Sequence, residues 1–321
     1  MEYKEYKLNK VKQESERFLN AKKNQNKNTF INYRASINYF IYYVENVIAC
    51  NVVSSDNINQ ILESFKGSLL AGFEYNNRTV KIKSSGVNTH LRRVKSFLKK
   101  CLALKTDVKY FDEGEPKYKA LTVKEIELLI NECSNVFKSN EIAVRNAILI
   151  RFLFNTALRI NEALTLKEEN VIADGNEFYI KIHEKGKPKD QLTGVAISEK
   201  TYNSLIAYMD LKAVKSDFVF STTRTSKDGK AKPLARENFN ADIRKLANYV
   251  DKKHATNISN IISNNSSHVF RHSRAIYLLK ECKADVVTVK KILRHKSINS
   301  TLIYLNPNDD EIKEVRINND I

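Results

Sequence analysis

The chain has 321 residues, of which 54 are Lys or Arg and 37 are Asp or Glu, so its formal charge at pH 7 is +17. This length is typical of about two domains, and the apolar content of 42% is enough to fill ordinary cores. The composition therefore excludes a chain that is disordered throughout. The basic excess favours a polyanionic partner such as nucleic acid, whose counterions are released on binding.

The sequence also argues against membrane, secreted and nucleotide-binding classes. The longest apolar run, residues 147–154, is interrupted by Arg151 and is far shorter than the roughly 20 residues that cross a bilayer. The N-terminal residues lack the apolar stretch of a signal peptide, so we expect a cytoplasmic protein with reduced thiols. There are only 8 Gly and no glycine-rich phosphate loop, and we expect no cofactor. We interpret the four widely spaced cysteines as packing residues: Cys50, Cys101, Cys133 and Cys282.

Residues 8–103 are predicted to form a helical domain, because they show helical spacing, almost no strand signals and no Pro. The pair Asn28–Thr29 is expected to cap a helix whose apolar positions run from residue 33 to residue 44. A second helix has an apolar face over residues 87–98 and a basic remainder. Residues 1–105 contain 19 Lys or Arg against 8 Asp or Glu, an excess of 11. The basic helix is consistent both with DNA contact and with a solvated face of a helical bundle.

Residues 104–117 lose periodicity and gain breaker residues, so we predict a linker there and a second domain over residues 118–321. Thr122 with Glu125 has the spacing of a capping box, and an apolar helix is predicted over 142–154. Alternating apolar residues over 178–182 and 195–197 predict a β-hairpin. Helical spacing returns from residue 239, and the Asn- and Ser-rich stretch 257–267 is expected to be a surface loop. The predicted fold class is mainly α with a small antiparallel β-sheet.

Four short segments of the second domain carry polar residues in a distinctive order. Residues 156–162 read TALRINE, so that an arginine directly follows the apolar helix. His268 and Arg271 are three residues apart, residues 293–295 read LRH, and Tyr304 lies nine residues after that histidine. Each segment alone occurs by chance, but four in one chain with consistent spacing are difficult to obtain accidentally.

In this order the segments resemble the boxes of the tyrosine recombinase (phage integrase) family. The family's T-G-L-R-I-S-E box is similar to residues 156–162, and its H-x-x-R box matches His268 and Arg271. Its L-G-H box, nine residues ahead of a tyrosine, matches residues 293–295 and Tyr304. The resemblance covers the whole second domain and implies a helical core-binding, that is DNA-binding, domain followed by a catalytic domain.

Four positions depart from the family pattern without removing a catalytic functional group. Ala157 and Arg294 stand where the family usually has Gly, Asn161 replaces the usual Ser, and Asn306 replaces a frequent His. Arg294 adds a charge beside the site, where we expect it to contact a DNA phosphate.

The resemblance implies breakage and rejoining of DNA strands through a 3′-phosphotyrosyl intermediate. Arg159 and Arg271 would hold the non-bridging phosphate oxygens, because two planar, permanently charged guanidiniums suit the transition state. Tyr304 would attack phosphorus, His268 would assist removal of its proton, and His295 would donate a hydrogen bond to the phosphate.

Family members also use a lysine in the turn of a β-hairpin to protonate the departing 5′ oxygen. Lys185 aligns best, and Lys187 and Lys189 are alternatives. His268 and His272 are four residues apart, as in a zinc helix, but Val269 stands where H-E-x-x-H has Glu, so no metal is expected. We interpret His272 as a structural or supporting residue.

The expected function is site-specific recombination for integration, excision, inversion or resolution of DNA elements. The alternatives are relaxation of the type IB topoisomerase kind and a non-catalytic DNA-binding protein of the same fold. The expected partners are duplex DNA with specific sites, three further copies of the chain in a homotetramer, and accessory proteins that set direction. Residues 312–317 predict a tail helix that packs on its own or a neighbouring protomer. The expected DNA-binding residues are Arg92, Lys95, Lys99, Lys187 and Arg294.

Overall fold

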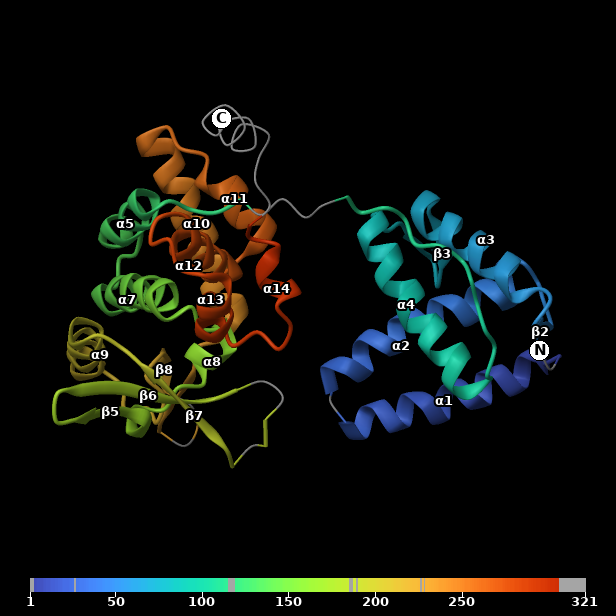
Figure 1. Cartoon of the computed structure of the whole chain (residues 1–321), viewed down its shortest axis with the longest axis horizontal. Coiled ribbons are helices and arrows are strands. Elements are labelled where there is room, and N and C mark those ends of the chain that lie inside the picture. Colours follow the sequence, from blue (N-terminus) through green and yellow to red (C-terminus); the bar gives the residue numbers. More distant parts are fainter. Residues whose placement is uncertain are drawn as a thin grey trace, which may run out of the picture. The chain divides into compact units, whose positions relative to one another are not determined.

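The chain is described here by a computed structural model, which covers residues 3–25, 27–114, 119–184, 187–188, 190–225, 227 and 229–305. It forms two compact units, Met1–Pro116 and Lys117–Ile321 (Figure 1). The division falls inside the segment predicted as a linker. In the described ranges, no helix combines the length and the apolar character that a membrane crossing requires.

The first unit is helical, with short strands between the helices. Three long helices, α1, α2 and α4, contact one another, and α3 packs against α4. The helices and the π-helical turn are α1 (Leu8–Gln25), α2 (Lys27–Tyr42), the turn Tyr43–Val47, α3 (Ile58–Ala71) and α4 (Ser84–Cys101). The strands are β1 (Glu5–Lys7), β2 (Val52–Ser54), β3 (Phe73–Tyr75) and β4 (Arg78–Val80).

The apolar spacing of α4 explains why this helix lies at the centre of the unit. Val87, Leu91, Val94, Phe97 and Leu98 recur every three or four residues and are all fully buried, as predicted. The segment after α4 adds to the same core. Leu104 and Val108 are buried in it, although both belong to the predicted linker, so most of that segment is part of the first unit.

Two details of the first unit differ from the prediction. Strands β1 and β2 pair, as do β3 and β4, although the sequence shows almost no strand signal. Each strand has only three residues, too few for an alternating pattern to be recognised. The helix predicted to begin after Asn28–Thr29 already includes Lys27, so that neither residue is its cap.

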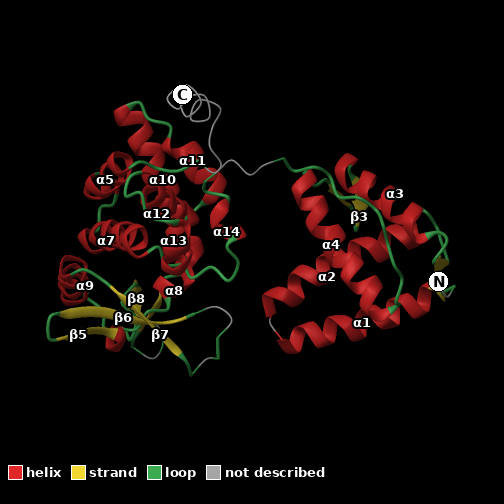
Figure 2. Ribbon diagram, in the orientation of Figure 1, coloured by secondary structure: helices red, strands yellow, loops and turns green. Residues whose placement is uncertain are grey.

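The second unit consists of helices around α7 with a three-stranded antiparallel sheet at one end (Figure 2). This confirms the predicted fold class. Its strands are β5 (Val171–Asp174), β6 (Glu177–His183), β7 (Leu192–Ala196), β8 (Ser221–Thr225) and β9 (Ala231–Pro233). Its helices include α5 (Val123–Asn131), α6 (Cys133–Val136), α7 (Asn140–Thr156), α8 (Ile160–Leu164), the 3₁₀ turn Glu168–Asn170, α9 (Glu199–Leu211) and α10 (Arg236–His254). The remaining helices are α11 (Ile258–Asn265), α12 (His268–Lys280), α13 (Val286–Leu293) and α14 (Asn299–Leu302).

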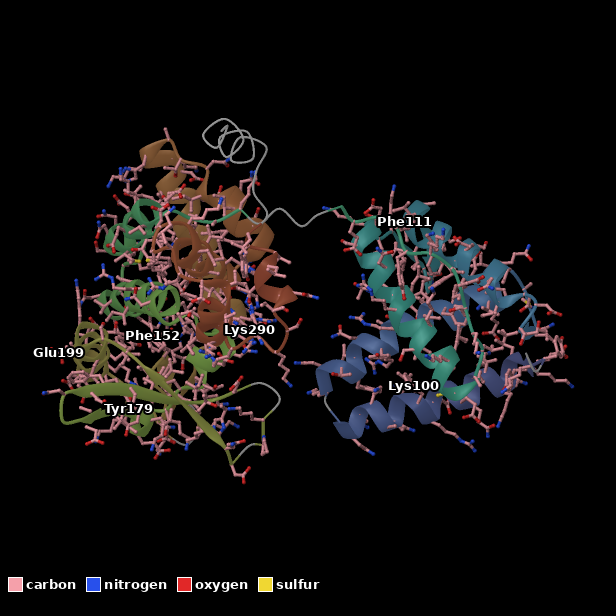
Figure 3. All side chains as sticks on the ribbon, viewed as in Figure 1. Lys100, Phe111, Phe152, Tyr179, Glu199 and Lys290 are labelled. Atoms are coloured by element: carbon pink, nitrogen blue, oxygen red, sulfur yellow. The ribbon has the colours of Figure 1, made fainter. Side chains whose placement is uncertain are left out.

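Helix α7 is buried or half-buried on nearly every side and packs against α5, α9 and α12. Phe152 on α7 is buried in the core, whereas Glu199 at the start of α9 is exposed (Figure 3). The predicted hairpin is present as β6 and β7, with Ile180 opposite Val195. The sheet and most of the helices therefore share one core, and the residue after α7, Ala157, joins α13 in a second, smaller apolar cluster beside the candidate site.

Two further predictions from local signals in the second unit had opposite outcomes. The Thr122 side chain accepts from the Glu125 backbone N–H and the Glu125 carboxylate accepts from the Thr122 backbone N–H, which confirms the capping box. The surface loop expected over residues 257–267 is instead largely the helix α11. Ile258 and Ile262, four residues apart, are fully buried, and this apolar pair outweighs the polar composition around it.

The interpretation of all four cysteines as packing residues was also too general. Cys133 is buried, Cys50 and Cys101 are half-buried, and Cys282 is exposed. Cys282 follows the end of α12, where the chain turns at the surface.

Candidate active site

Two of the helices that end at a left-handed residue are each followed closely by a predicted catalytic residue. Ala157, after α7, has φ 51° and ψ 28°; Arg294, after α13, has φ 53° and ψ 46°. These are two of the positions where the family pattern has Gly, the residue that adopts this conformation without steric cost. The two turns lie next to each other, since Arg159 Nη2 donates to the Arg294 carbonyl at 3.4 Å, and Arg159 and His295 are thus brought to one place.

Arg271 connects these two turns through their backbone carbonyls. It lies on α12 and is only 4% exposed. Its Nη1 donates to the Ala157 carbonyl at 2.5 Å, and its Nη2 donates to the Leu293 carbonyl. Burial, followed by the nearby positive charges of Arg159 and Arg294, lowers the Arg271 pKa to about 10. Arg271 is therefore both a cation of the site and the residue that fixes the turns relative to each other.

Arg159 is held by an acid that the sequence analysis did not single out. Its Nη1 donates to Glu162 Oε1 at 2.9 Å, and its backbone N–H donates to Glu162 Oε2 at 2.9 Å. Glu162 is 4% exposed, whereas the Arg159 side chain is 27% exposed. The three-residue spacing on a helix is the sequence signal that could have identified this pair.

Tyr304 is buried beside these cations, at 5% exposure. It follows α14 and packs in a small apolar cluster with residues of α12 and α13, among them Leu278, Val289 and Leu293. Its hydroxyl lies 2.6 Å from Nδ1 of His272, and the two ring centroids are 5.5 Å apart. The structure thus brings the predicted nucleophile to His272, which we had interpreted as a structural or supporting residue.

The other two histidines of the motifs lie next to this pair. The His268 ring is 6.3 Å from that of His272, one turn along α12, and His268 is exposed. The His295 ring stacks 6.4 Å from that of Tyr304, and its Nδ1 lies 2.9 Å from the buried Thr301 hydroxyl. Burial, followed by neighbouring charged groups, lowers the pKa of His272 and of His295 to about 4. Both rings are therefore neutral at pH 7.

The hairpin lysines are only partly covered by the structure. Lys185 and Lys189 lie outside the described residues. Lys187 forms an ion pair with Glu184 at 3.1 Å and donates to the Thr193 hydroxyl at 3.0 Å. It is thus held at the base of the β6–β7 turn.

The predicted DNA-binding residues that the structure describes differ in their surroundings. In α4, Arg92 pairs with Glu113 at 3.3 Å, Lys95 donates to the Val108 carbonyl, and Lys99 is exposed. Arg294 turns inward: its Nη2 donates to Glu162 Oε2 at 2.8 Å, and its side chain is 10% exposed. DNA contact by these residues stays a prediction.

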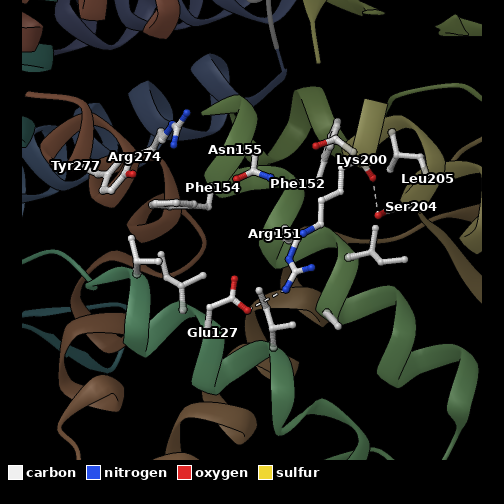
Figure 4. A pocket seen from close by; sticks show the side chains of 16 residues that line it. Glu127, Arg151, Phe152, Phe154, Asn155, Lys200, Ser204, Leu205, Arg274 and Tyr277 are labelled. Atoms are coloured by element: carbon white, nitrogen blue, oxygen red, sulfur yellow. Dashed lines mark hydrogen bonds and ion pairs between the residues drawn. The ribbon is translucent and has the colours of Figure 1, made fainter. Parts of the chain in front are cut away.

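The second unit also contains a cavity that is separate from this cluster. It has a volume of about 450 Å³ and lies between α5, α7, α9 and α12. Arg151 and Glu127 form an ion pair of 2.8 Å on its wall, with Arg274 and Tyr277 at one end (Figure 4). None of the candidate catalytic residues within the described ranges lines it, so the cavity is not the cationic site.

The expectations about a metal site and about the C-terminal tail can be compared with the structure only within the described residues. Within the described residues, no group of three or more His, Cys, Asp or Glu side chains could hold a metal ion. Asn306 and the tail helix predicted over residues 312–317 lie outside the described residues.

The family model described as the phage integrase family matches residues 119–311. Among curated proteins, the tyrosine recombinase XerC of Rickettsia bellii is 25% identical over 293 residues, covering 90% of this chain and 89% of that protein. The tyrosine recombinase XerD of Chlorobaculum tepidum is 28% identical over 201 residues, covering 61% and 59%.

Solved structures show the same fold. The XerH site-specific recombinase bound to a palindromic difH substrate superposes with a TM-score of 0.65 at 20% identity, covering 89% of this chain and 78% of that one. The Tn1549 transposon integrase in complex with transposon right end DNA also gives 0.65, at 16% identity, covering 96% and 98%. The family model matches more than half of the chain, including every box, and the chain belongs to the phage integrase family of tyrosine recombinases.

Proposed function

We propose that this protein is a site-specific DNA recombinase that cleaves and rejoins strands through a covalent bond between Tyr304 and a 3′ phosphate. The observation that carries the proposal is the position of the Tyr304 hydroxyl within the cluster that contains Arg159, Arg271 and His295. The XerC and XerD relatives are tyrosine recombinases, and the XerH and Tn1549 structures contain DNA, which supports the same substrate here. The cytoplasmic location predicted from the sequence belongs to this proposal.

The proposed step is a substitution at phosphorus. The Tyr304 oxygen forms a bond to the scissile phosphorus, the bond from phosphorus to the 5′ oxygen breaks, and that oxygen takes a proton from the hairpin lysine, Lys185 in our assignment. Arg159 and Arg271 stabilise the charge that develops on the non-bridging oxygens. The reverse of this step, with a different 5′ hydroxyl as nucleophile, joins a new strand without ATP or metal.

The neutral rings of His295 and His272 suit two parts of this step, the binding of the phosphate and the attack by Tyr304. A Thr301 hydroxyl that donates to Nδ1 of His295 leaves the ring proton on Nε2, from which His295 donates to the phosphate. A Tyr304 phenol that donates to Nδ1 of His272 keeps the lone pairs of the tyrosine oxygen available for the attack. His272 is then the immediate acceptor of the tyrosine proton, and His268, whose ring lies 6.3 Å from that of His272, assists its removal from one turn away.

The assembly belongs to the same proposal. Four protomers would act on two duplex sites, and the exposed lysines and arginines of the first unit would hold the flanking DNA. Accessory proteins that set the direction of the reaction are a further proposed class of partner.

A covalent adduct tests the chemistry. The probe is a pool of duplexes with randomised arms and a nick just 3′ of the scissile phosphate, so that the short 5′-hydroxyl fragment diffuses away and the adduct accumulates. Denaturing electrophoresis recovers the adduct, and sequencing of its DNA supplies one enriched duplex for the later assays. Tyr304→Phe should abolish the adduct, whereas Tyr202→Phe and Tyr277→Phe should keep it. An adduct that survives Tyr304→Phe would refute the assignment of the nucleophile.

Exchange between two DNA molecules distinguishes recombination from simple relaxation. Two labelled duplexes that carry the enriched site should yield recombinant strands. Relaxation of a supercoiled plasmid without any exchange would favour the topoisomerase-like alternative.

The lysine assignment has its own test. A 5′-thio leaving group departs without protonation, so it should restore adduct formation to the variant that lacks the correct lysine. We expect rescue of Lys185→Ala. Rescue of Lys187→Ala or Lys189→Ala instead would move the role to that residue.

A further inference from the structure

Arg294 has an unusual place for an arginine. It lies directly before His295 in the left-handed conformation, with φ 53°, which is strained for a residue other than glycine. Its guanidinium is directed away from solvent, and its Nη1 donates to the Ile292 carbonyl at 3.2 Å. Within the described part of the chain, its buried Nε has no hydrogen-bond partner. A long charged side chain is thus held inside, at a position where the family pattern has no side chain.

The contact that Arg294 makes there is with the acid that holds Arg159. Glu162 Oε1 accepts from Arg159 Nη1, while Oε2 accepts from the Arg159 backbone and, at 2.8 Å, from Arg294 Nη2. One buried carboxylate therefore lies between two guanidiniums. A fourth bond joins the arginines directly, from Arg159 Nη2 to the Arg294 carbonyl at 3.4 Å.

The charges of this group show what the extra arginine changes. Arg159, Arg271 and Arg294 with Glu162 carry three positive charges and one negative charge, a net +2. With glycine at residue 294 the same group would carry +1, and Glu162 would neutralise Arg159 alone. A second carboxylate that interacts with Arg294 in the described part of the chain, Glu184, is paired with Lys187.

We propose that Arg294 is a positioning residue for strand cleavage: by sharing Glu162, it leaves the positive charge of Arg159 available to the scissile phosphate. A phosphodiester carries one negative charge, and attack by an oxyanion raises it towards two, so that a net +2 complements the transition state better than +1 does. This inference rests on the proposed function, because it assumes that Arg159 faces the reacting phosphate.

The primary test replaces Arg294 by residues that tolerate its backbone conformation. Arg294→Asn and Arg294→Gly both accept a left-handed φ and remove the charge, whereas Arg294→Lys keeps the charge. The measurement is the single-turnover rate of adduct formation on the enriched nicked duplex, at saturating protein. Loss of a direct oxyanion donor lowers a catalytic rate by about 100- to 1000-fold. Because Arg294 would act indirectly, the Arg294→Asn and Arg294→Gly variants should form the adduct about 10- to 100-fold more slowly than the native protein. The Arg294→Lys variant should stay within about threefold of the native rate.

Two further measurements separate charge from mere structure. Adding Glu162→Gln to Arg294→Asn removes the carboxylate that would neutralise Arg159 and restores the net +2, so the double variant should cleave faster than Arg294→Asn alone. A methylphosphonate at the scissile position lacks one negative charge, and on it the rate penalty of Arg294→Asn should shrink. A purely structural role predicts neither the recovery nor the smaller penalty, and absence of both would overturn the proposal.

DNA affinity supplies the remaining control. If Arg294→Asn weakens binding of the duplex while the cleavage rate of the bound complex is unchanged, Arg294 contacts DNA and the proposal is wrong. If the native protein forms no adduct, or Tyr304→Phe still forms one, the proposed function itself fails. By contrast, if the native protein cleaves DNA and the Arg294 variants cleave it at the same rate, only the present inference is refuted.

Discussion

Replacing either of the arginines proposed to be catalytic, Arg159 or Arg271, by lysine should abolish cleavage, but only the change at Arg271 should also strongly destabilise the second unit. Arg271 is 4% exposed and donates to two backbone carbonyls, those of Ala157 and Leu293. A lysine at 271 presents a single ammonium in place of the planar fork, so that at least one buried carbonyl loses its partner. Hydrogen bonds from charged donors contribute about 1.5–3 kcal/mol each, and we expect Arg271→Lys to cost about 2–4 kcal/mol.

Arg159→Lys is the matched control for this prediction. The Arg159 side chain is 27% exposed, and a lysine there can still pair with Glu162, so the cost in unfolding free energy should stay below about 1 kcal/mol. The chain has no Trp, and its 15 Tyr are spread over both units. Hydrogen exchange in increasing urea, read by mass spectrometry on peptides of α7 and α10, reports on the second unit alone. Equal destabilisation by the two variants would refute a structural role of Arg271.

Three further predictions concern stability. Burial lowers the pKa of His272 in the second unit and of His90 in the first unit to about 4, from an ordinary 6.5. Both units should therefore be fully stable above pH 6.5 and lose stability as the pH falls towards 4, and thermal unfolding at pH 7.5 and at pH 5 measures this loss. Asp285 accepts from two backbone N–H groups at the start of α13; Asp285→Ala should lower the midpoint of urea unfolding, and Asp285→Asn should lower it much less. The hydrogen bond from Lys253, with further donors, lowers the pKa of Glu132 to about 2, so the stability that Glu132 contributes should be lost only below pH 4.5. Glu132→Gln should lower the free energy of unfolding by about 1–2 kcal/mol at pH 7 and abolish this loss of stability in acid.

The sequence predicted those parts of the fold that local chemistry determines. The capping box at Thr122, the apolar face of α4 and the hairpin around Ile180 each require only a few neighbouring residues, and the structure contains all three. The loop predicted over 257–267 was wrong because composition was given more weight than the spacing of Ile258 and Ile262. Short-range spacing proved more informative than composition where the two disagreed.

The surroundings of the candidate site depend on contacts that no short stretch of sequence reveals. The pairing of Arg294 with Glu162 joins residues 132 positions apart, and that of His272 with Tyr304 spans 32 positions. The motifs therefore indicated which residues gather, but not which partner each one would have. Lys95 shows the same limit, since its amine binds the Val108 carbonyl of its own unit.

The two left-handed residues explain how the site tolerates departures from the family pattern. Ala157 and Arg294 each accept backbone strain of roughly 1 kcal/mol that Gly would avoid, and each lies where Arg271 binds the adjoining backbone, at the carbonyls of Ala157 and Leu293. The guanidinium bonds exceed that strain in magnitude, so the turns persist without glycine. At Ala157 the side chain is fully buried and adds no function, whereas at Arg294 it reaches Glu162 and adds a charge. A change that removes Arg271 should therefore disturb both turns together, because the strain at each would no longer be opposed.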